Sequence, residues 1–189
     1  LRSLVGSEMC IRDSDSLLLI IDVQEKLLNA VFNKELCSKK AEIIAKAANI
    51  LGIPVIVTEQ YPKGLGNTVE PLKSKLGDNV QYFEKTAFSA LDNQDVLNAL
   101  EKANKKQVVI FGIETHICVS QTTAALIKSG YEVNVIKDAC GSRAETEYIA
   151  GLERMKDNGA HILTTEIALF EWLKGAKHPN FKDIQALIK

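Results

Sequence analysis

The chain has 189 residues, of which 46% are hydrophobic and 25% charged, which is typical of one globular domain with a sizeable core. Its 23 basic and 24 acidic residues leave a formal charge of −1, so no basic excess predicts a nucleic-acid partner and no polybasic run predicts a membrane surface. The longest apolar runs have about six residues, far fewer than the roughly 20 that cross a bilayer.

The four cysteines, Cys10, Cys37, Cys118 and Cys140, show neither CxxC spacing nor a pairing pattern. This distribution argues against a disulfide framework and against a zinc knuckle. We therefore expect the protein in a reducing, cytoplasmic setting.

Residues 1–14 (LRSLVGSEMCIRDS) differ from the rest of the chain because they carry no strand or helix periodicity. They also lack the charged, apolar and cleavage regions of a secretory signal. We interpret them as a translated adaptor or a mis-assigned start, with a native disordered tail as the alternative. In both cases we expect this segment to be poorly ordered or loosely packed, and we place a single domain at residues 15–189.

From residue 15 onward, short apolar runs alternate with longer helical patterns, which is the signature of parallel βαβ units. Residues 17–22 (LLLIID) are apolar up to the final Asp, as in a strand buried on both faces. A helical pattern over 33–51 ends at Gly52, a residue that suits a helix C-terminus. Residues 54–58 (PVIVT) are the second strand. Residues 59–71 are rich in Gly and Pro, and we expect a long irregular loop of the kind that usually carries function.

The second half of the chain continues the same alternation. We expect four more strands, at 80–84, 107–112, 132–137 and 161–164. We expect helices at 92–103 (capped by Asp92), 116–128, 144–158 and 166–174, followed by a C-terminal tail at 179–189. The pattern predicts an α/β fold with three layers (α/β/α, Rossmann-like) around a six-stranded, mostly parallel sheet.

Two charged residues follow expected strands, and in open α/β sheets ligands bind beyond the carboxyl ends of the strands. Asp22 ends the most apolar strand. A desolvated carboxylate has a raised pKa and suits a general base, although an N-cap for the next helix is the alternative. Lys85 follows the strand at 80–84, where it can balance Asp22 or hold an anionic intermediate. A solvated surface lysine is the alternative there.

Cys118 lies just after the strand at 107–112, at the expected start of a helix. Free N–H groups and the helix dipole lower a thiol pKa there and can receive an oxyanion. A buried structural cysteine is the alternative, and Cys140 follows a strand in the same way, so position alone does not separate the two. Together with Asp22 and Lys85, Cys118 makes a base, a cation and a nucleophile suited to acyl transfer.

The order of these motifs resembles that of the isochorismatase-like cysteine hydrolases, a superfamily that includes nicotinamidases and N-carbamoylsarcosine amidase. A strand-ending Asp is followed by KTAFSA at 85–90 and GIETHICV at 112–119, and the similarity covers residues 16–189. Three further segments resemble the branch called isochorismatase domain-containing proteins, whose substrates are poorly defined. They are TEQYPKGLGNT at 58–68, DACGSR at 138–143 and HPNFKDIQALI at 178–188.

The resemblance implies an Asp–Lys–Cys catalytic triad, which falls on Asp22, Lys85 and Cys118. By analogy Asp22 accepts the thiol proton, Lys85 stabilises the thiolate, and Cys118 attacks a carbonyl carbon to give a thioester that water hydrolyses. The family also carries a non-proline cis peptide before the cysteine, here between Ile113 and Glu114. That bond would aim backbone N–H groups, those of Glu114 and Cys118, at the oxyanion.

The resemblance also implies a small-molecule substrate, no nucleic-acid or membrane partner, and a homo-oligomer. Nicotinamidases hold zinc through an Asp and histidines in the loop after the second strand, and residues 59–71 contain no histidine. We therefore expect no metal. The resemblance also implies that no cofactor is needed and that the reaction is hydrolysis of an amide or related C–N or ester bond. The alternative is a binding or scaffold protein that keeps the fold without useful turnover. Candidate pocket residues are Gln60, Tyr61, Phe88, Glu114, Thr115 and Ile117, with a core position as the alternative for Phe88 and Ile117.

Overall fold

The computed structural model describes residues 10–189. Its centre is a six-stranded sheet in the order β3-β2-β1-β4-β5-β6, in which every neighbouring pair is parallel. The strands are β1 (Ser16–Ile21), β2 (Val55–Gln60), β3 (Val80–Lys85), β4 (Gln107–Gly112), β5 (Glu132–Ile136) and β6 (His161–Leu163). This sheet confirms the predicted α/β class and strand number.

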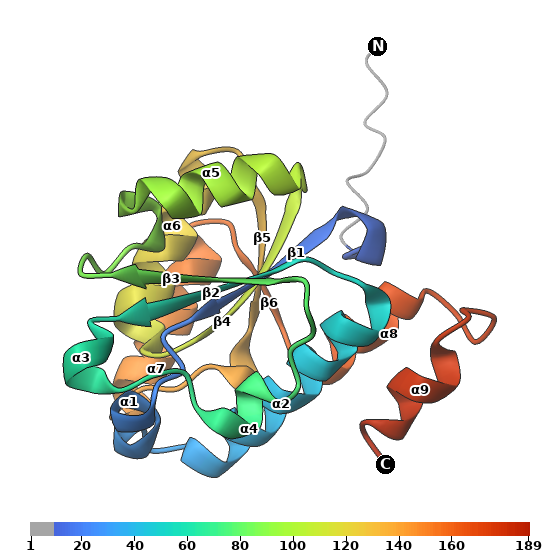
Figure 1. Ribbon diagram of the computed structural model, residues 1–189, viewed down its shortest axis with the longest axis horizontal. Coiled ribbons are helices and arrows are strands. Elements are labelled where there is room, and N and C mark those ends of the chain that lie inside the picture. Colours follow the sequence, from blue (N-terminus) through green and yellow to red (C-terminus); the bar gives the residue numbers. More distant parts are fainter. Residues whose placement is uncertain (1–9) are drawn as a thin grey trace.

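Helices cover both faces of the sheet (Figure 1). On one face α2 packs against α8, and on the other α6 packs against α7. The helices are α1 (Glu25–Ala30), α2 (Lys34–Leu51), α3 (Pro62–Leu65), α4 (Glu70–Lys73), α5 (Gln94–Ala103), α6 (Ser120–Lys128), α7 (Glu145–Asp157), α8 (Thr165–Leu173) and α9 (Phe181–Ala186). The layers therefore match the predicted three-layer arrangement.

The two central strands explain the most apolar parts of the sequence. Every residue of β1 and of β4 is buried, because helices cover both faces of a parallel sheet. At their carboxyl ends the two strands come so close that a Cβ on Gly112 would lie 1.9 Å from the backbone oxygen of Ile21. Gly112 also has a φ of 142°, a backbone conformation that residues other than glycine rarely adopt.

Short helices account for the main corrections to the sequence prediction. The expected loop at 59–71 contains the end of β2 and two four-residue helices, α3 and α4, each with a proline in its first turn. The six-residue α1 was not predicted, and the expected C-terminal tail contains α9, whose Ile184 is buried. Helices this short are too brief to show a 3.6-residue apolar period. The cap of α5 is the side chain of Asn93, which accepts from Asp95 N, and Asp92 is wrong in that role.

The described part of the N-terminal segment packs more closely than expected. The side chain of Ile11 is fully buried, and its N–H donates to Glu171 Oε2 at 2.8 Å. The N–H of Arg12 donates to Gln107 Oε1 at 2.8 Å. The expectation of loose packing is therefore wrong for these residues, while residues 1–9 lie outside the described part. A domain boundary near residue 15 stays a prediction.

None of the helices in residues 10–189 combines the length and the apolar character needed to cross a membrane.

Candidate active site

Three residues from three different strand ends meet at the carboxyl edge of the sheet. Asp22 follows β1, Lys85 ends β3, and Cys118 lies in a π-helical turn (Thr115–Val119) between β4 and α6. Lys85 Nζ lies 2.6 Å from Asp22 Oδ2, and the two side chains are 1% and 0% exposed. Asp22 and Lys85 both act on the pKa of the Cys118 thiol, Asp22 raising it and Lys85 lowering it, so the thiol lies close to the pair. A carboxylate, an ammonium and a thiol therefore form one compact cluster.

Asp22 is held by Thr58, a residue of the neighbouring strand β2. Thr58 Oγ1 donates to Asp22 Oδ1 at 2.7 Å, and the Asp22 N–H donates to the carbonyl of Thr58. Asp22 has a φ of 52°, which is uncommon for a residue other than glycine and is often found at functional sites. The alternative of an N-cap is wrong, because α1 begins after Gln24 and the Asp22 carboxylate is engaged by Thr58 and Lys85.

Lys85 is a buried cation with four oxygen neighbours. Its Nζ donates to Asp22 Oδ2 and to Gln60 Oε1, each at 2.6 Å. The carbonyl oxygens of Ala87 and Phe88 lie at 3.2 and 3.1 Å. The alternative of a solvated surface lysine is therefore wrong, and the loop after β3 is attached to the Asp22 carboxylate through this ammonium.

Burial sets the proton affinities of the cluster. Desolvation raises the pKa of Asp22, although the Lys85 charge and the hydrogen bonds to the carboxylate oppose the shift. Burial, followed by the negative charge of Asp22, raises the pKa of the Cys118 thiol to about 12, and Lys85 only partly offsets this. The predicted lowering of the thiol pKa is therefore wrong, because burial and the Asp22 charge raise it. A thiol with this raised pKa keeps its proton at neutral pH, so it must lose the proton during attack.

The other described cysteines lie away from this cluster. Cys140 is fully buried, and its pKa is raised by desolvation and by its neighbours Cys37 and Asp138. Cys37 is also buried, and its thiol donates to the carbonyl of Ala139 at 3.3 Å. Cys10 is exposed. Geometry therefore distinguishes Cys118 from Cys140, which sequence position does not.

The segment before Cys118 is fixed from the neighbouring β5–α7 connection. The peptide bond between Ile113 and Glu114 is cis. Thr115 N and Thr115 Oγ1 both donate to the carbonyl of Gly141, at 2.9 and 3.0 Å. The Glu114 carboxylate accepts from Arg143 Nε at 2.9 Å. Among the described residues, the Glu114 N–H donates to no backbone or side-chain acceptor.

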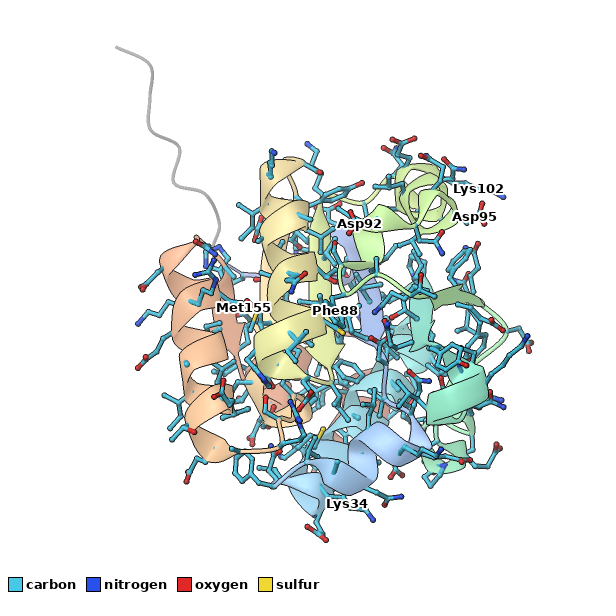
Figure 2. All side chains as sticks on the ribbon, turned by 90° about the vertical axis from the view of Figure 1, so that its left-hand side faces the viewer. Lys34, Phe88, Asp92, Asp95, Lys102 and Met155 are labelled. Atoms are coloured by element: carbon cyan, nitrogen blue, oxygen red, sulfur yellow. The ribbon has the colours of Figure 1, made fainter. Side chains whose placement is uncertain are left out.

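The predicted pocket residues lie in different environments. Tyr61 and Phe88 are 56% and 53% exposed, so the core alternative is wrong for Phe88. Figure 2 looks onto the side toward which β2 and β3 point in Figure 1, and Phe88 lies near the middle of it. Gln60 contacts Lys85, and Ile117 packs against the core. Thr115 is wrong as a pocket residue because its side chain is buried and bonded to Gly141.

A cavity of about 470 Å³ adjoins the cluster beside Lys85. It lies between α3, the end of β3 and the start of α5. Its lining is Tyr61, Pro62, Lys63, Glu84, Lys85, Thr86, Ala87, Asp92, Asn93 and Gln94. Within residues 10–189, no three His, Cys, Asp or Glu side chains are grouped so that they could hold a metal ion.

Two residues of the site were missed by sequence reasoning. Thr58 and Gln24 are both fully buried, and both bond to residues of the cluster or its support. Thr58 ends the stretch predicted as the second strand, and Gln24 comes two residues after Asp22. A polar residue next to a strand end is the one signal that could have identified them.

The turn that carries Cys118 depends on a close approach by α7. A Cβ on Gly151 would lie 2.8 Å from His116 Cα and 3.0 Å from His116 N. We expect Gly151→Ala to displace this turn, lowering stability by about 1–3 kcal/mol and slowing alkylation of Cys118. Chemical denaturation and peptide mapping after iodoacetamide treatment measure the two effects. Gly175→Ala is the matched control, because nothing lies within 4 Å of a Cβ there. Equal behaviour of the two variants would contradict this role.

Most of the chain matches a known protein family. The model of the Isochorismatase domain matches residues 16–167. The chain belongs to the isochorismatase family. It is 43% identical over 176 residues to Isochorismatase family protein 1A of Dictyostelium discoideum, covering 91% of this chain and 85% of that protein. It is 38% identical to Isochorismatase domain-containing protein 2 of Xenopus laevis, covering 93% and 84%. These matches confirm the predicted family and branch.

Among solved structures, the chain is similar to the MAR1 ribonuclease of Caenorhabditis elegans. The TM-score is 0.91 and the identity 38%, with 95% of this chain and 92% of that chain covered. This structural similarity confirms the predicted fold class.

Proposed function

We propose that the protein is a cysteine hydrolase that cleaves an amide, or a related C–N or ester bond, of a small molecule through a thioester on Cys118. Membership of the isochorismatase family supports a hydrolase. The observation that carries the proposal is the buried Lys85–Asp22 pair at 2.6 Å, close enough to the Cys118 thiol for both charges to act on its pKa. No metal or cofactor is needed for the two half-reactions of this chemistry, and a homo-oligomer stays a prediction.

In the first half-reaction Asp22 takes the thiol proton as Cys118 Sγ bonds to the substrate carbonyl carbon. The carbonyl oxygen becomes an oxyanion facing the Glu114 N–H, whose hydrogen bond stabilises it. The intermediate then collapses, the C–N bond breaks, and the proton on Asp22 passes to the leaving nitrogen. Lys85 stays an ammonium throughout and offsets whichever of the carboxylate or thiolate carries the negative charge.

In the second half-reaction water attacks the thioester carbon while Asp22 accepts a proton from it. Collapse of this second tetrahedral intermediate breaks the C–S bond, and the sulfur recovers the proton from Asp22. The products are a carboxylic acid and the free enzyme. One carboxylate thus serves as base and then as acid in each half-reaction, which suits a group whose pKa is raised.

RNA cleavage is the second candidate, because a protein 38% identical to this chain is called a ribonuclease. Lys85, and Arg143 beside the turn that carries Cys118, are each paired with a carboxylate. This pairing reduces the positive potential that RNA phosphates require, and it favours a small neutral or polar substrate.

The test is capture of the acyl-enzyme. The protein is incubated with a panel of small amides and esters, quenched in acid, and mapped by mass spectrometry of its peptides. We expect an acyl adduct on Cys118, and a loss of turnover of about 10³-fold or more in Cys118→Ala. Cys10→Ser is the matched control, because Cys10 is an exposed thiol away from the site.

Three results would overturn the proposal. An adduct on Cys140 with Cys118 unmodified would show that Cys118 is not the nucleophile. Equal turnover by wild type and Cys118→Ala would remove its role. No turnover and no adduct across the panel, together with tight binding of a partner, would favour the alternative of a binding or scaffold protein. RNA cleavage that Cys118→Ala leaves intact would belong to a different site or to a contaminant.

A further inference from the structure

Gln24 is a fully buried polar residue that the proposed hydrolysis does not use. It follows Asp22 by two residues and directly precedes α1. Its side chain makes no capping hydrogen bond to that helix. Burying an amide is costly unless its hydrogen bonds are satisfied, so the partners of Gln24 indicate what the residue does.

Those partners are backbone atoms at the end of β2. Gln24 Oε1 accepts from the N–H of Gln60 at 2.7 Å, and Gln24 Nε2 donates to the carbonyl of Gln60 at 2.9 Å. The amide therefore pairs with both backbone groups of one residue, as a neighbouring strand does. Nε2 also donates to the carbonyl of Gly66 at 2.6 Å, which joins the loop after α3 to the same point.

Gln60, which Gln24 binds in this way, is the residue that contacts the buried Lys85 ammonium. Gln60 Oε1 accepts from Lys85 Nζ at 2.6 Å, as short as the bond from Lys85 to Asp22. Gln60 Nε2 donates to the carbonyl of Thr86 at 2.7 Å, which fixes the orientation of the amide. A chain of hydrogen bonds thus runs from Gln24 through Gln60 to Lys85 and ends at the Asp22 carboxylate.

We propose that Gln24 is a positioning residue that acts through Gln60 to hold the Lys85 ammonium against Asp22 and Cys118. This role rests on the proposed function of the Asp22–Lys85–Cys118 cluster. Without the grip of Gln24, the end of β2 relaxes and the Gln60 oxygen moves off the ammonium. The positive charge of Lys85 lowers the pKa of the Cys118 thiol. After this movement Lys85 is less well placed to stabilise negative charge on the sulfur.

The experiment follows alkylation of Cys118 by iodoacetamide from pH 6 to 10 in the full chain, with peptide mapping to separate each thiol. Cys10 is exposed and serves as the internal reference in every sample. The variants are Gln24→Met, Gln60→Met and the double variant, because Met keeps the length of the side chain and removes its amide. Gln107→Met is the matched control, since Gln107 is a buried glutamine at the opposite end of the sheet whose amide also binds backbone.

We expect Gln24→Met to slow alkylation of Cys118 by about threefold or more at pH 8, with its pH profile moved to higher pH. In the Gln60→Met background the same change should have almost no further effect, because coupled residues are non-additive. Gln107→Met should leave the profile unchanged. Thermal melting of each variant separates this effect from a general loss of stability, which would affect the fraction folded and not the pH profile.

Two results would overturn the inference. In the first, Gln24→Met and Gln60→Met keep the wild-type profile while Asp22→Asn shifts it, so that the cluster stands and the positioning role falls. In the second, the effects of Gln24→Met and Gln60→Met add in full, which would mean that Gln24 does not act through Gln60. Were Gln24→Met to fail to fold, Gln24→Glu keeps the Oε1 acceptor, removes the Nε2 donor, and is compared in the same cycle. A profile unmoved by Asp22→Asn as well would reject the proposed function itself.

Discussion

Replacing Lys85 with Met is expected to destabilise the protein by about 3–5 kcal/mol, because it leaves the Asp22 carboxylate buried without a cation. Both side chains are almost fully buried, and they lie 2.6 Å apart. The loop after β3 also loses its tie to the ammonium through the carbonyls of Ala87 and Phe88. Urea denaturation at pH 8 measures the change. Lys39→Met, in an exposed part of α2, is the control and should change stability by less than about 0.5 kcal/mol.

The destabilisation should depend on pH in a defined direction. Desolvation already raises the pKa of Asp22 in the folded protein, and removal of Lys85 takes away the charge that opposes this shift. A carboxyl group with a raised folded-state pKa is best tolerated when protonated, so its penalty is largest above that pKa and shrinks as the pH falls toward the unfolded value. Lys85→Met should therefore lose less stability at pH 5 than at pH 8. Asp22→Asn/Lys85→Met, which removes both charges, should recover most of the loss. A double variant as unstable as Lys85→Met would contradict this account.

The strands were predictable because burial on both faces leaves a continuous apolar run. β1 and β4 are the central strands, and each contains a continuous run of apolar residues. Asp22 and Cys118 could be singled out for a related reason, since each follows such a run and therefore lies at the carboxyl edge of the sheet. The helices α1, α3 and α4 were not predictable, because four to six residues give no recognisable period.

The supporting residues of the site could not be predicted because their roles depend on contacts between distant segments. Thr58 is separated by 36 residues from Asp22, and Gln24 by 36 from Gln60. The position of Gln24 near a strand end is a local signal, but it does not tell which segment the glutamine contacts. The direction of the thiol pKa shift was wrongly predicted because the balance between burial, the Asp22 charge and the Lys85 charge depends on three-dimensional packing.

Replacing Asp22 with Asn is expected to separate proton transfer from thiol reactivity. Turnover should fall by about 10²–10⁴-fold, because Asn cannot take the thiol proton or return it to the leaving nitrogen. The pKa of Cys118 should fall, since the carboxylate charge that raises it is gone and Lys85 remains beside the sulfur. Simple alkylation, which requires only the thiolate, should therefore become faster at neutral pH while hydrolysis is lost.

The measurement pairs steady-state hydrolysis with the pH profile of Cys118 alkylation in Asp22→Asn. Asp138→Asn is the matched control, because Asp138 follows β5 at the same edge of the sheet and its carboxylate accepts from Thr165 N and Oγ1. The control should keep both the hydrolysis rate and the Cys118 profile. In wild type, hydrolysis should decline as the pH falls through the raised pKa of Asp22, because a protonated carboxyl group cannot act as the base. Unchanged turnover in Asp22→Asn, or a thiol pKa that rises in that variant, would show that Asp22 is not the proton acceptor for Cys118.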